Sequence, residues 1–360
     1  MSSGAALILR LSSLGDVVLA GHLPSLLRAA EPGRRILFAT KEHFGRLLRN
    51  HPDVDRFYLL SDGSADPAAA APLAVTGSAG DLRAALRREG VSEIFDLQQN
   101  LRSSRVAASL DSARRVPFEK HGVRRRLLVH ARWLRPRPLP PLLRRYRALA
   151  GLPHDAPLRP WLRDALTPSE AARAADRVGG DRAEPFVLLA PGARWATKRW
   201  PVRHVASLAS RLSAESGLAY RIAVSPDESD LAAALAEALP PGGRERIVRL
   251  DFREASAVAA RARAIVSNDS AFLHLGPALG VPALGLFGST VPGFGFASGE
   301  PRDAVAEIEL SCRPCGVHGK RRCPRGHHHC MERLDPSLVM ERLRSLLHAA
   351  RGHDAPGGSG

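Results

Sequence analysis

Two polar turns, joined by a short apolar segment, contain the residues of this chain that are best suited to binding a ligand. An apolar run over 264–266 stops at Asn268-Asp269-Ser270, and a second run over 281–287 stops at Gly288-Ser289. The segment between them has the character of a helix and ends at Gly280, so the order is strand, turn, helix, strand. Ligands bind at the carboxyl ends of strands in open parallel sheets, and helix N-termini attract anions. The spacing therefore predicts a site for a phosphorylated ligand.

A second candidate turn follows the first expected strand, Leu7 to Leu9. Ser12, Ser13 and Gly15 permit a tight turn, and Asp16 stands at or near the start of the next helix. Asp caps helices well in this position, a contribution of ~1 kcal/mol. A carboxylate at the carboxyl edge of a sheet can also act as a general base. The spacing leaves both interpretations open.

All four cysteines lie within residues 312–330, in the order Cys312-x2-Cys315-x7-Cys323-x6-Cys330, with histidines among them. This spacing is more typical of a structural zinc or iron–sulfur ligand set than of a disulfide framework. A structural zinc, free thiols, and disulfides or a cluster all remain open. We expect that any metal here is structural and that catalysis requires no cofactor.

The formal net charge is +16, and basic residues concentrate in one block, residues 101–150, where fourteen Lys or Arg stand against two acids. Such a block indicates an anionic partner: nucleic acid, a membrane surface or a phosphorylated substrate. Arginines on solvated faces are the plain alternative, but they explain the abundance of Arg better than they explain the scarcity of acids. The clustering therefore favours a partner.

Short apolar runs alternate with amphipathic stretches in both halves of the chain, which is typical of parallel sheets with helices on both faces. We expect an α/β protein of two doubly wound domains. No apolar stretch approaches the ~20 residues of a spanning helix, and the start lacks the features of a secretory signal, so we expect a cytoplasmic protein. The expected parts are a first domain over 1–155, a linker over 156–182, a second domain over 183–335, a C-terminal helix over 336–350 and a flexible tail over 351–360.

Four motifs in chain order resemble those of glycosyltransferase family 9, the ADP-heptose:lipopolysaccharide heptosyltransferases. Arg10 to Asp16 resembles the opening motif of the family, and Asp96 to Ser103 resembles its acceptor-side segment. Pro191 to Pro201 resembles its phosphate-binding loop, and Asn268 to Ser289 its nucleotide-sugar motif. The G-x-G-x-x-G and P-loop fingerprints are both missing from the sequence, which argues against a dehydrogenase or a kinase.

The resemblance implies a GT-B fold, in which two Rossmann-like domains face each other across a cleft. It implies an inverting transfer of heptose from ADP-heptose to the anionic inner core of lipopolysaccharide, with Asp16 as the general base and Lys198 at the departing diphosphate. The donor-binding residues that it implies are Ser12, Ser13, Gly15, Thr197, Lys198, Asp227, Glu228, Asp269, Ser270, Ala271, His274, Gly288 and Ser289. The expected acceptor-binding residues are Arg10, Gln98, Arg102, Arg105, Lys120 and Arg124. His274 is equally compatible with an interior histidine, and Asp227 with a simple turn.

The expected partners are an ADP-sugar donor, an anionic glycolipid acceptor and the cytoplasmic face of the inner membrane. Leu127-Leu128-Val129, among the arginines, is compatible with a membrane-touching face and equally with inward packing. One rival is a nucleic-acid-binding protein that uses the basic block and the Cys/His cluster. It would need aromatic residues among the charges or a recognition helix. Aromatic residues are only 5% of the chain, so we expect no nucleic acid. A second rival is an inactive GT-B binding protein, against which the presence of Asp16 and Lys198 argues.

Overall fold

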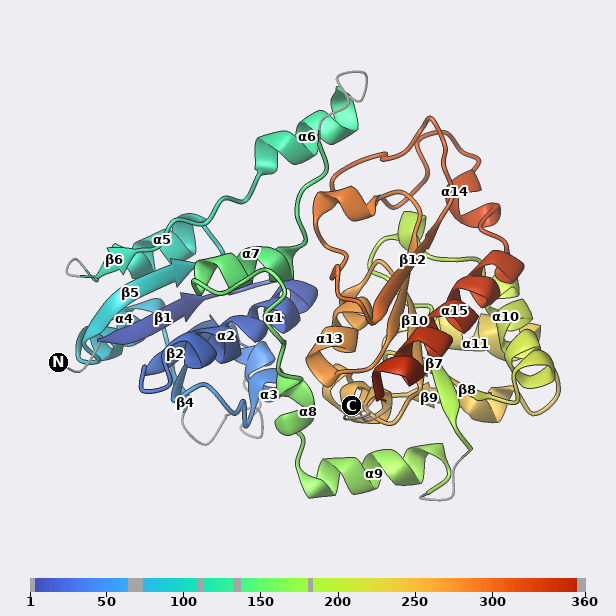
Figure 1. Ribbon diagram of the computed structural model, residues 1–360, viewed down its shortest axis with the longest axis horizontal. Coiled ribbons are helices and arrows are strands. Elements are labelled where there is room, and N and C mark those ends of the chain that lie inside the picture. The colour runs from blue at the N-terminus through green and yellow to red at the C-terminus, as the bar shows by residue number, and fades with distance from the viewer. Residues whose placement is uncertain are drawn as a thin grey trace, which may run out of the picture. The chain divides into compact units, whose positions relative to one another are not determined.

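The structure is a computed structural model that describes residues 4–63, 74–108, 110, 113–131, 137–180 and 184–354. The chain forms two compact units: residues 1–120 with 143–166, and residues 121–142 with 167–360. Each unit contains a six-stranded sheet, and the strand pairs of both sheets are parallel (Figure 1). The expected α/β class with two doubly wound halves is therefore confirmed.

The first sheet has the strand order β4-β3-β2-β1-β5-β6, so β1 occupies the middle. The strands are β1 (Ala5–Leu9), β2 (Ile36–Lys41), β3 (Arg56–Leu60), β4 (Ala74–Gly77), β5 (Val91–Asp96) and β6 (Arg114–Arg115). The helices of this unit are α1 (Leu14–Ala20), α2 (His22–Ala30), α3 (Gly45–Leu48), α4 (Ala79–Arg87), α5 (Leu101–Ala107), α7 (Leu142–Leu149) and α8 (Trp161–Asp164).

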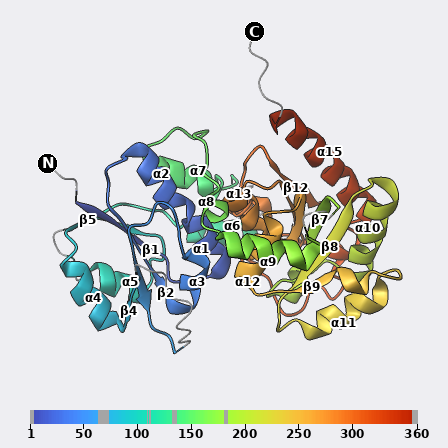
Figure 2. The same ribbon diagram turned by 90° about the horizontal axis from the view of Figure 1, so that it is seen from below.

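Helices cover both faces of this first sheet. On one face, Leu82 and Leu86 of α4 and Val106 of α5 join Leu7 and Tyr58 of the strands in one buried core. On the other face lie α2 and α7 (Figure 2). Because neither face meets water, β1 is a continuous apolar run rather than an alternating one.

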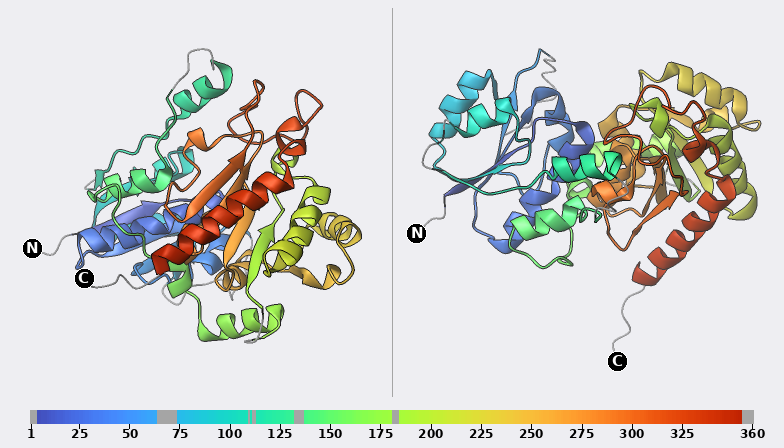
Figure 3. Two further views of the ribbon diagram at one scale, coloured as in Figure 1. Left: turned by 45° about the vertical axis from the view of Figure 1, so that its right-hand side comes forward. Right: turned by 90° about the horizontal axis from the view of Figure 1, so that it is seen from above.

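The second sheet has the strand order β12-β11-β10-β7-β8-β9. Its strands are β7 (Phe186–Ala190), β8 (Ala219–Val224), β9 (Ile247–Arg249), β10 (Ala264–Asn268), β11 (Ala283–Phe287) and β12 (Asp303–Glu307). The helices of this unit are α6 (Gly122–His130), α9 (Pro168–Val178), α10 (Val202–Glu215), α11 (Ser229–Ala238), α12 (Phe252–Ala259), α13 (Leu275–Leu279), α14 (His329–Glu332) and α15 (Pro336–Asp354). Leu208 of α10, Leu235 of α11 and Leu343 of α15 pack into one core with the strands. The red helix α15 runs beside the orange strands in Figure 3.

The segment 121–142, which we expected in the first domain, belongs to the second unit. Arg125 of α6 donates a hydrogen bond to the carbonyl of Phe294 at 3.1 Å, and its guanidinium lies 4.4 Å from the ring centre of Phe296. The Leu139 N–H donates to the carbonyl of Gly293 at 2.9 Å. These contacts join residues far apart in the sequence, so no local pattern could reveal them.

The expected linker over 156–182 contains two helices that belong to different units. Trp161 of α8 is fully buried in the first unit, where its ring stacks on His51. Glu170 of α9 pairs with Arg253 of α12 in the second unit at 2.9 Å. The C-terminal helix continues to Asp354, so the expected tail begins as helix and its last six residues lie outside the described residues. Among the described helices, none has the length and apolar character needed to cross a membrane.

Candidate active site

The turn after β1 places Asp16 in the first turn of α1. The helix begins at Leu14, so Ser13 is its N-cap and Asp16 is its third residue. Oδ2 of Asp16 accepts hydrogen bonds from the Ser13 N–H at 3.1 Å and from the Ser13 hydroxyl at 2.8 Å. The Ser12–Ser13 peptide bond in this turn is cis. Asp16 therefore caps α1, as the capping interpretation predicted.

Arg10 holds the same carboxylate. Its Nη2 lies 2.6 Å from Oδ2 of Asp16, and the two side chains are 12% and 22% exposed. Burial acts to raise the pKa of Asp16, but the Arg10 cation and the Ser13 hydrogen bonds outweigh it and hold that pKa below its usual value. Within the described part of the chain these contacts all reach Oδ2, which leaves Oδ1 as the oxygen that can accept a proton from a ligand.

Gln98, just after β5, braces this β1–α1 turn. Its side-chain Oε1 accepts hydrogen bonds from the N–H groups of Leu11 and Ser12, both at 3.1 Å. The Lys120 ammonium in turn donates to the backbone carbonyl of Gln98. Because β1 and β5 are neighbours, their two carboxyl ends hold the turn together. The structure thus brings two predicted acceptor residues, Gln98 and Lys120, to the turn that carries Asp16.

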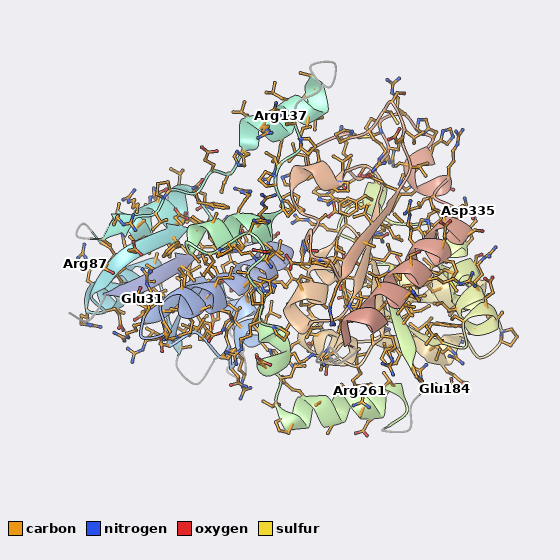
Figure 4. All side chains as sticks on the ribbon, viewed as in Figure 1. Glu31, Arg87, Arg137, Glu184, Arg261 and Asp335 are labelled. Atoms are coloured by element: carbon orange, nitrogen blue, oxygen red, sulfur yellow. The ribbon has the colours of Figure 1, made fainter. Side chains whose placement is uncertain are left out.

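The other predicted acceptor residues lie on helices α5 and α6. Arg102 and Arg105 are both exposed on α5. Arg124 lies on α6 in the second unit, where its Nε donates to the carbonyl of Arg137 at 3.0 Å and its Nη2 to the carbonyl of Pro138 at 3.3 Å. Figure 4 labels Arg137 beside α6. The Arg124 guanidinium therefore bonds to backbone carbonyls of its own unit.

In the second unit an ion pair lies where the strands end. Nζ of Lys198 is 2.5 Å from Oδ2 of Asp269, and the two side chains are 15% and 7% exposed. The Thr290 hydroxyl donates to the same Oδ2 at 2.6 Å. Lys198 comes from the loop after β7, Asp269 directly follows β10, and Thr290 follows β11. Three strand ends thus contribute to one charged cluster.

The loop after β7, residues 191–201, is fixed from two sides. The side chain of Asn268 accepts from the Trp200 N–H at 3.2 Å and donates to the Pro191 carbonyl at 2.6 Å. The buried Thr197 hydroxyl accepts from the Lys320 N–H at 2.8 Å. Thr197, predicted to bind the donor, therefore also joins its loop to the Cys/His segment 312–330.

The remaining residues of the predicted nucleotide-sugar motif sit around the same strand ends. Ser270 begins the short helical turn that contains Ala271, and its hydroxyl lies 3.1 Å from that of Ser267. His274 is buried, as the alternative interpretation predicted. The Ser289 hydroxyl is enclosed and has no hydrogen-bond partner among the described residues. Since buried hydroxyls are nearly always hydrogen-bonded, this turn has bonding capacity that the protein itself does not use.

The two acidic residues after β8, Asp227 and Glu228, differ in exposure and in contacts. Asp227 is exposed, and its hydrogen bond from Ser225 lowers its pKa. The Glu228 carboxylate lies against Gly192, where a Cβ would come within 2.5 Å of Oε1, so a larger residue at 192 would displace the Glu228 side chain. Glu228 therefore reaches the 191–201 loop, whereas Asp227 has the character of a turn residue.

The four cysteines are free thiols, with Cys330 buried. Burial raises the pKa of Cys330 to about 11, Arg313 opposes that rise, and the neighbouring thiols of Cys315, Cys323 and Cys312 add to it. The thiols of Cys312, Cys315 and Cys323 therefore lie near enough to Cys330 to affect its pKa. In the described ranges no three His, Cys, Asp or Glu side chains are arranged to hold a metal ion. The ligand types suit zinc, but the set is not preassembled.

No sequence motif pointed to Arg313, which is the most heavily hydrogen-bonded side chain behind this site. It is 4% exposed on its side chain and pairs with Glu307 at 2.7 Å. Three further bonds reach the turn after β11, residues 287–290, and one reaches the carbonyl of Ile308. An arginine directly between two cysteines, Cys312 and Cys315, is the one signal that could have drawn attention to it.

Two Rossmann-like units in one chain, one with a capped carboxylate on its first βα turn and one with a partly buried ammonium at its strand ends, are the components of a GT-B fold. The model of glycosyltransferase family 9 (heptosyltransferase) matches residues 80–324, and the chain belongs to this family. The predicted resemblance is confirmed, and the protein is a glycosyltransferase enzyme.

Relatives and solved structures agree with this assignment. The chain is 28% identical to lipopolysaccharide heptosyltransferase 1 of Pseudomonas aeruginosa over 385 residues, covering 95% of this chain and 98% of the relative. It is 28% identical to lipooligosaccharide heptosyltransferase 2 of Haemophilus influenzae over 227 residues, 58% of this chain and 63% of the relative. The fold matches E. coli ADP-heptose lps heptosyltransferase II with a TM-score of 0.68 at 20% identity, covering 96% and 99% of the two chains. It matches E. coli heptosyltransferase WaaC with ADP with a TM-score of 0.63 at 20% identity, covering 95% and 99%.

Proposed function

We propose that this protein transfers heptose from ADP-heptose to the anionic inner core of a lipopolysaccharide, with inversion at the anomeric carbon. Membership of the family and the near-full-length similarity to a lipopolysaccharide heptosyltransferase support this substrate class. The observation that carries the proposal is the Lys198–Asp269 pair at three strand ends. It provides a partly buried ammonium at the sheet edge where α/β proteins bind phosphates, and a departing diphosphate requires a cation there.

In the first unit the proposal assigns the role of general base to Asp16. Its lowered pKa keeps the carboxylate ionised at neutral pH. Oδ1 accepts the proton of the acceptor hydroxyl while Oδ2 stays with Arg10 and Ser13. A base of low pKa is weak, but the hydroxyl becomes more acidic as its oxygen bonds to carbon, so the proton moves as the attack proceeds.

The proposed reaction is a single displacement. The acceptor oxygen bonds to the anomeric carbon as the bond from that carbon to the diphosphate oxygen breaks, which inverts the configuration. The electron pair leaves with ADP, and the Lys198 ammonium stabilises the charge that develops there. Glu228, whose carboxylate reaches the 191–201 loop, is our candidate for binding the ribose hydroxyls.

We propose that the acceptor is met at the cytoplasmic face of the inner membrane. Among the described residues the exposed large hydrophobics are Leu101, Val123 and Leu127, at 79%, 72% and 39% exposure. All three lie in the basic block, and α6 carries three arginines and no acid. Apolar side chains among arginines suit an anionic bilayer, where each cation contributes about 1 kcal/mol.

We further propose a structural zinc held by Cys312, Cys315, Cys323 and Cys330. Zinc binds four thiolates in closed structural sites, and the mutual influence of these thiols supports their proximity. The ion would fix the segment 312–330 and would take no part in transfer. Elemental analysis of the purified protein should find about one zinc per chain by this coordination rule. Four titratable thiols with no metal would contradict the proposal.

The direct test of the function is an assay with purified protein, ADP-heptose and a lipopolysaccharide core that lacks heptose. Mass spectrometry of the glycolipid should show the gain of one heptose, matched by release of ADP. Thermal-shift measurements with ADP, UDP, GDP and CMP sugars should show stabilisation by the ADP sugar above the others. Transfer from a different nucleotide sugar would correct the donor, and absence of transfer from every donor would contradict the enzyme proposal.

A further inference from the structure

We infer that Arg313 is a positioning residue for the donor site, and that it sets the place of the Lys198 ammonium through Thr290 and Asp269. The inference rests on the proposed function, because it concerns the same site. Arg313 belongs to the Cys/His segment, to which neither the reaction nor the sequence motifs assign a part in donor binding.

Arg313 holds the backbone of the turn after β11. Its Nη2 donates to the carbonyl of Phe287 at 3.1 Å and to the carbonyl of Thr290 at 2.9 Å. Its Nε donates to the carbonyl of Gly288. The carbonyl of the remaining turn residue, Ser289, accepts from the Cys315 N–H at 2.9 Å. All four carbonyls of residues 287–290 are thus bound from the Cys/His segment, three of them by one guanidinium.

An arginine is the side chain suited to this place. Several carbonyl dipoles pointing toward one spot need a cation with donors in several directions, and guanidinium supplies five N–H groups in a rigid plane. A lysine would supply charge but only one nitrogen. Glu307, 2.7 Å from Nη2, balances the charge at the more exposed end of the side chain.

The turn at 287–290 also fixes the charged cluster of the donor site, which consists of Lys198, Asp269 and Thr290. Thr290 connects Arg313 to this cluster. Its carbonyl accepts a hydrogen bond from Arg313, and its hydroxyl donates to Oδ2 of Asp269 at 2.6 Å. The same Oδ2 is 2.5 Å from Nζ of Lys198. A shift of the turn would withdraw one hydrogen-bond donor from a carboxylate that is 7% exposed. In surroundings of low dielectric constant the ammonium would move to compensate, and small displacements there change its interaction with a diphosphate.

A purely structural Arg313 would have a different signature. If Arg313 served stability alone, its replacement would lower the melting temperature, but the folded molecules would bind nucleotide as before. The chain offers a matched control in Arg253, which is also buried in the second unit and makes two hydrogen bonds of 2.9 Å to Glu170. Arg253 bonds to Glu170 of α9 rather than to carbonyls of the 287–290 turn, so its replacement serves as the control for stability.

The experiment is a double-mutant cycle with ADP as the probe, measured by titration calorimetry on the full chain. Arg313→Lys and Thr290→Val should each weaken ADP binding ~10-fold, since each removes hydrogen bonds to a charged or dipolar partner. Because the two act in series, the double variant should also lose ~10-fold and not ~100-fold. Arg253→Lys should lower the melting temperature and leave ADP affinity unchanged. Thr290→Val keeps the shape and backbone of Thr290, so it reports on the link even where an Arg313 variant folds poorly.

The outcomes separate this inference from the function on which it rests. Wild-type protein that binds no nucleoside diphosphate contradicts the proposed function. Wild-type protein that binds ADP, with Arg313→Lys and Thr290→Val binding it equally well, overturns the inference and leaves the function standing. Additive losses in the double variant would show that Arg313 does not act through Thr290, which also overturns it.

Discussion

Arg10 and Asp16 bracket the β1–α1 turn, and their side chains meet at 2.6 Å across it. The same oxygen of Asp16 that pairs with Arg10 also caps α1 through Ser13. A single carboxylate thus stabilises the helix with one oxygen and keeps the other for a proton. Structural and chemical roles coexist in this residue, and variants can separate them.

Asp16→Asn should abolish transfer while leaving α1 intact. An amide oxygen still accepts from Ser13, but an amide cannot take a proton, so kcat should fall by about 10²–10⁴-fold. ADP affinity, measured by calorimetry, should stay near the wild-type value. Asp81→Asn is the matched control, because Asp81 forms the same capping box with Ser78 on α4. If the Asp16→Asn variant has the same kcat as the Asp81→Asn variant, Asp16 is not the general base.

Arg10→Gln should move the acid limb of the pH–rate profile to higher pH. Asp16 must be ionised to act as a base, and the Arg10 cation helps to hold its pKa down. Without that cation the pKa of Asp16 rises, so activity should begin to fall at a higher pH than in the wild type. The profile of kcat/KM against pH for the two proteins measures this shift. Superimposable profiles would show that the base is another group.

Lys198→Ala should weaken donor binding or turnover by ~2–3 kcal/mol, because a cation at a leaving diphosphate acts in a dry site. The variant also leaves the buried Asp269 carboxylate without its partner, and part of the effect could be loss of stability. Lys198→Met combined with Asp269→Asn removes both charges and controls for this. Restored stability with transfer still impaired is the expected result. Normal transfer in the double variant would place the required cation elsewhere.

Continuous apolar runs followed by Ser, Asn, Asp or Gly made the strand ends and the candidate turns predictable, since parallel strands are buried on both faces. We expected Asp16 at or near the start of α1, but the helix begins at Leu14, and the Ser13-x-x-Asp16 spacing is a capping box that points to that start. That signal was present in the sequence.

Other features depend on contacts between distant residues and have no local signal. Arg313 bonds the carbonyls of a turn about 25 residues earlier in the chain. The assignment of α6 to the second unit depends on its contact with Phe294, 169 residues away from Arg125. Motif spacing predicts which residues carry chemistry, but not which distant side chains hold them.

His51 should make the first unit sensitive to acid. It is fully buried, with Nε2 2.7 Å from the Gly21 carbonyl and its ring stacked on Trp161. Burial is the main cause that lowers its pKa from 6.5 to about 4. A base with a lowered folded pKa stabilises the fold above its unfolded pKa, and that contribution is lost as pH falls from about 6.5 toward 4.

The wild-type protein should therefore lose about 2 kcal/mol of unfolding free energy through His51 between pH 7.5 and pH 5. His51→Gln, whose amide can donate to the Gly21 carbonyl, should be less stable at pH 7.5 but lose less on acidification. Denaturant unfolding at the two pH values measures both slopes. If both proteins lose the same unfolding free energy between the two pH values, the pKa of His51 does not differ between the folded and unfolded chains.

Val123 and Leu127 of α6 should contribute to binding anionic membranes. They lie four residues apart on one helical face and are exposed, while Arg124 and Arg125 bond to backbone carbonyls of their own unit. Replacing both with Ser removes apolar contact without altering charge, so co-sedimentation with vesicles containing phosphatidylglycerol should fall by ~10-fold. Leu101→Ser, on α5, tests the third exposed hydrophobic residue separately. If Leu101→Ser weakens binding and the α6 variant does not, the membrane contact belongs to α5.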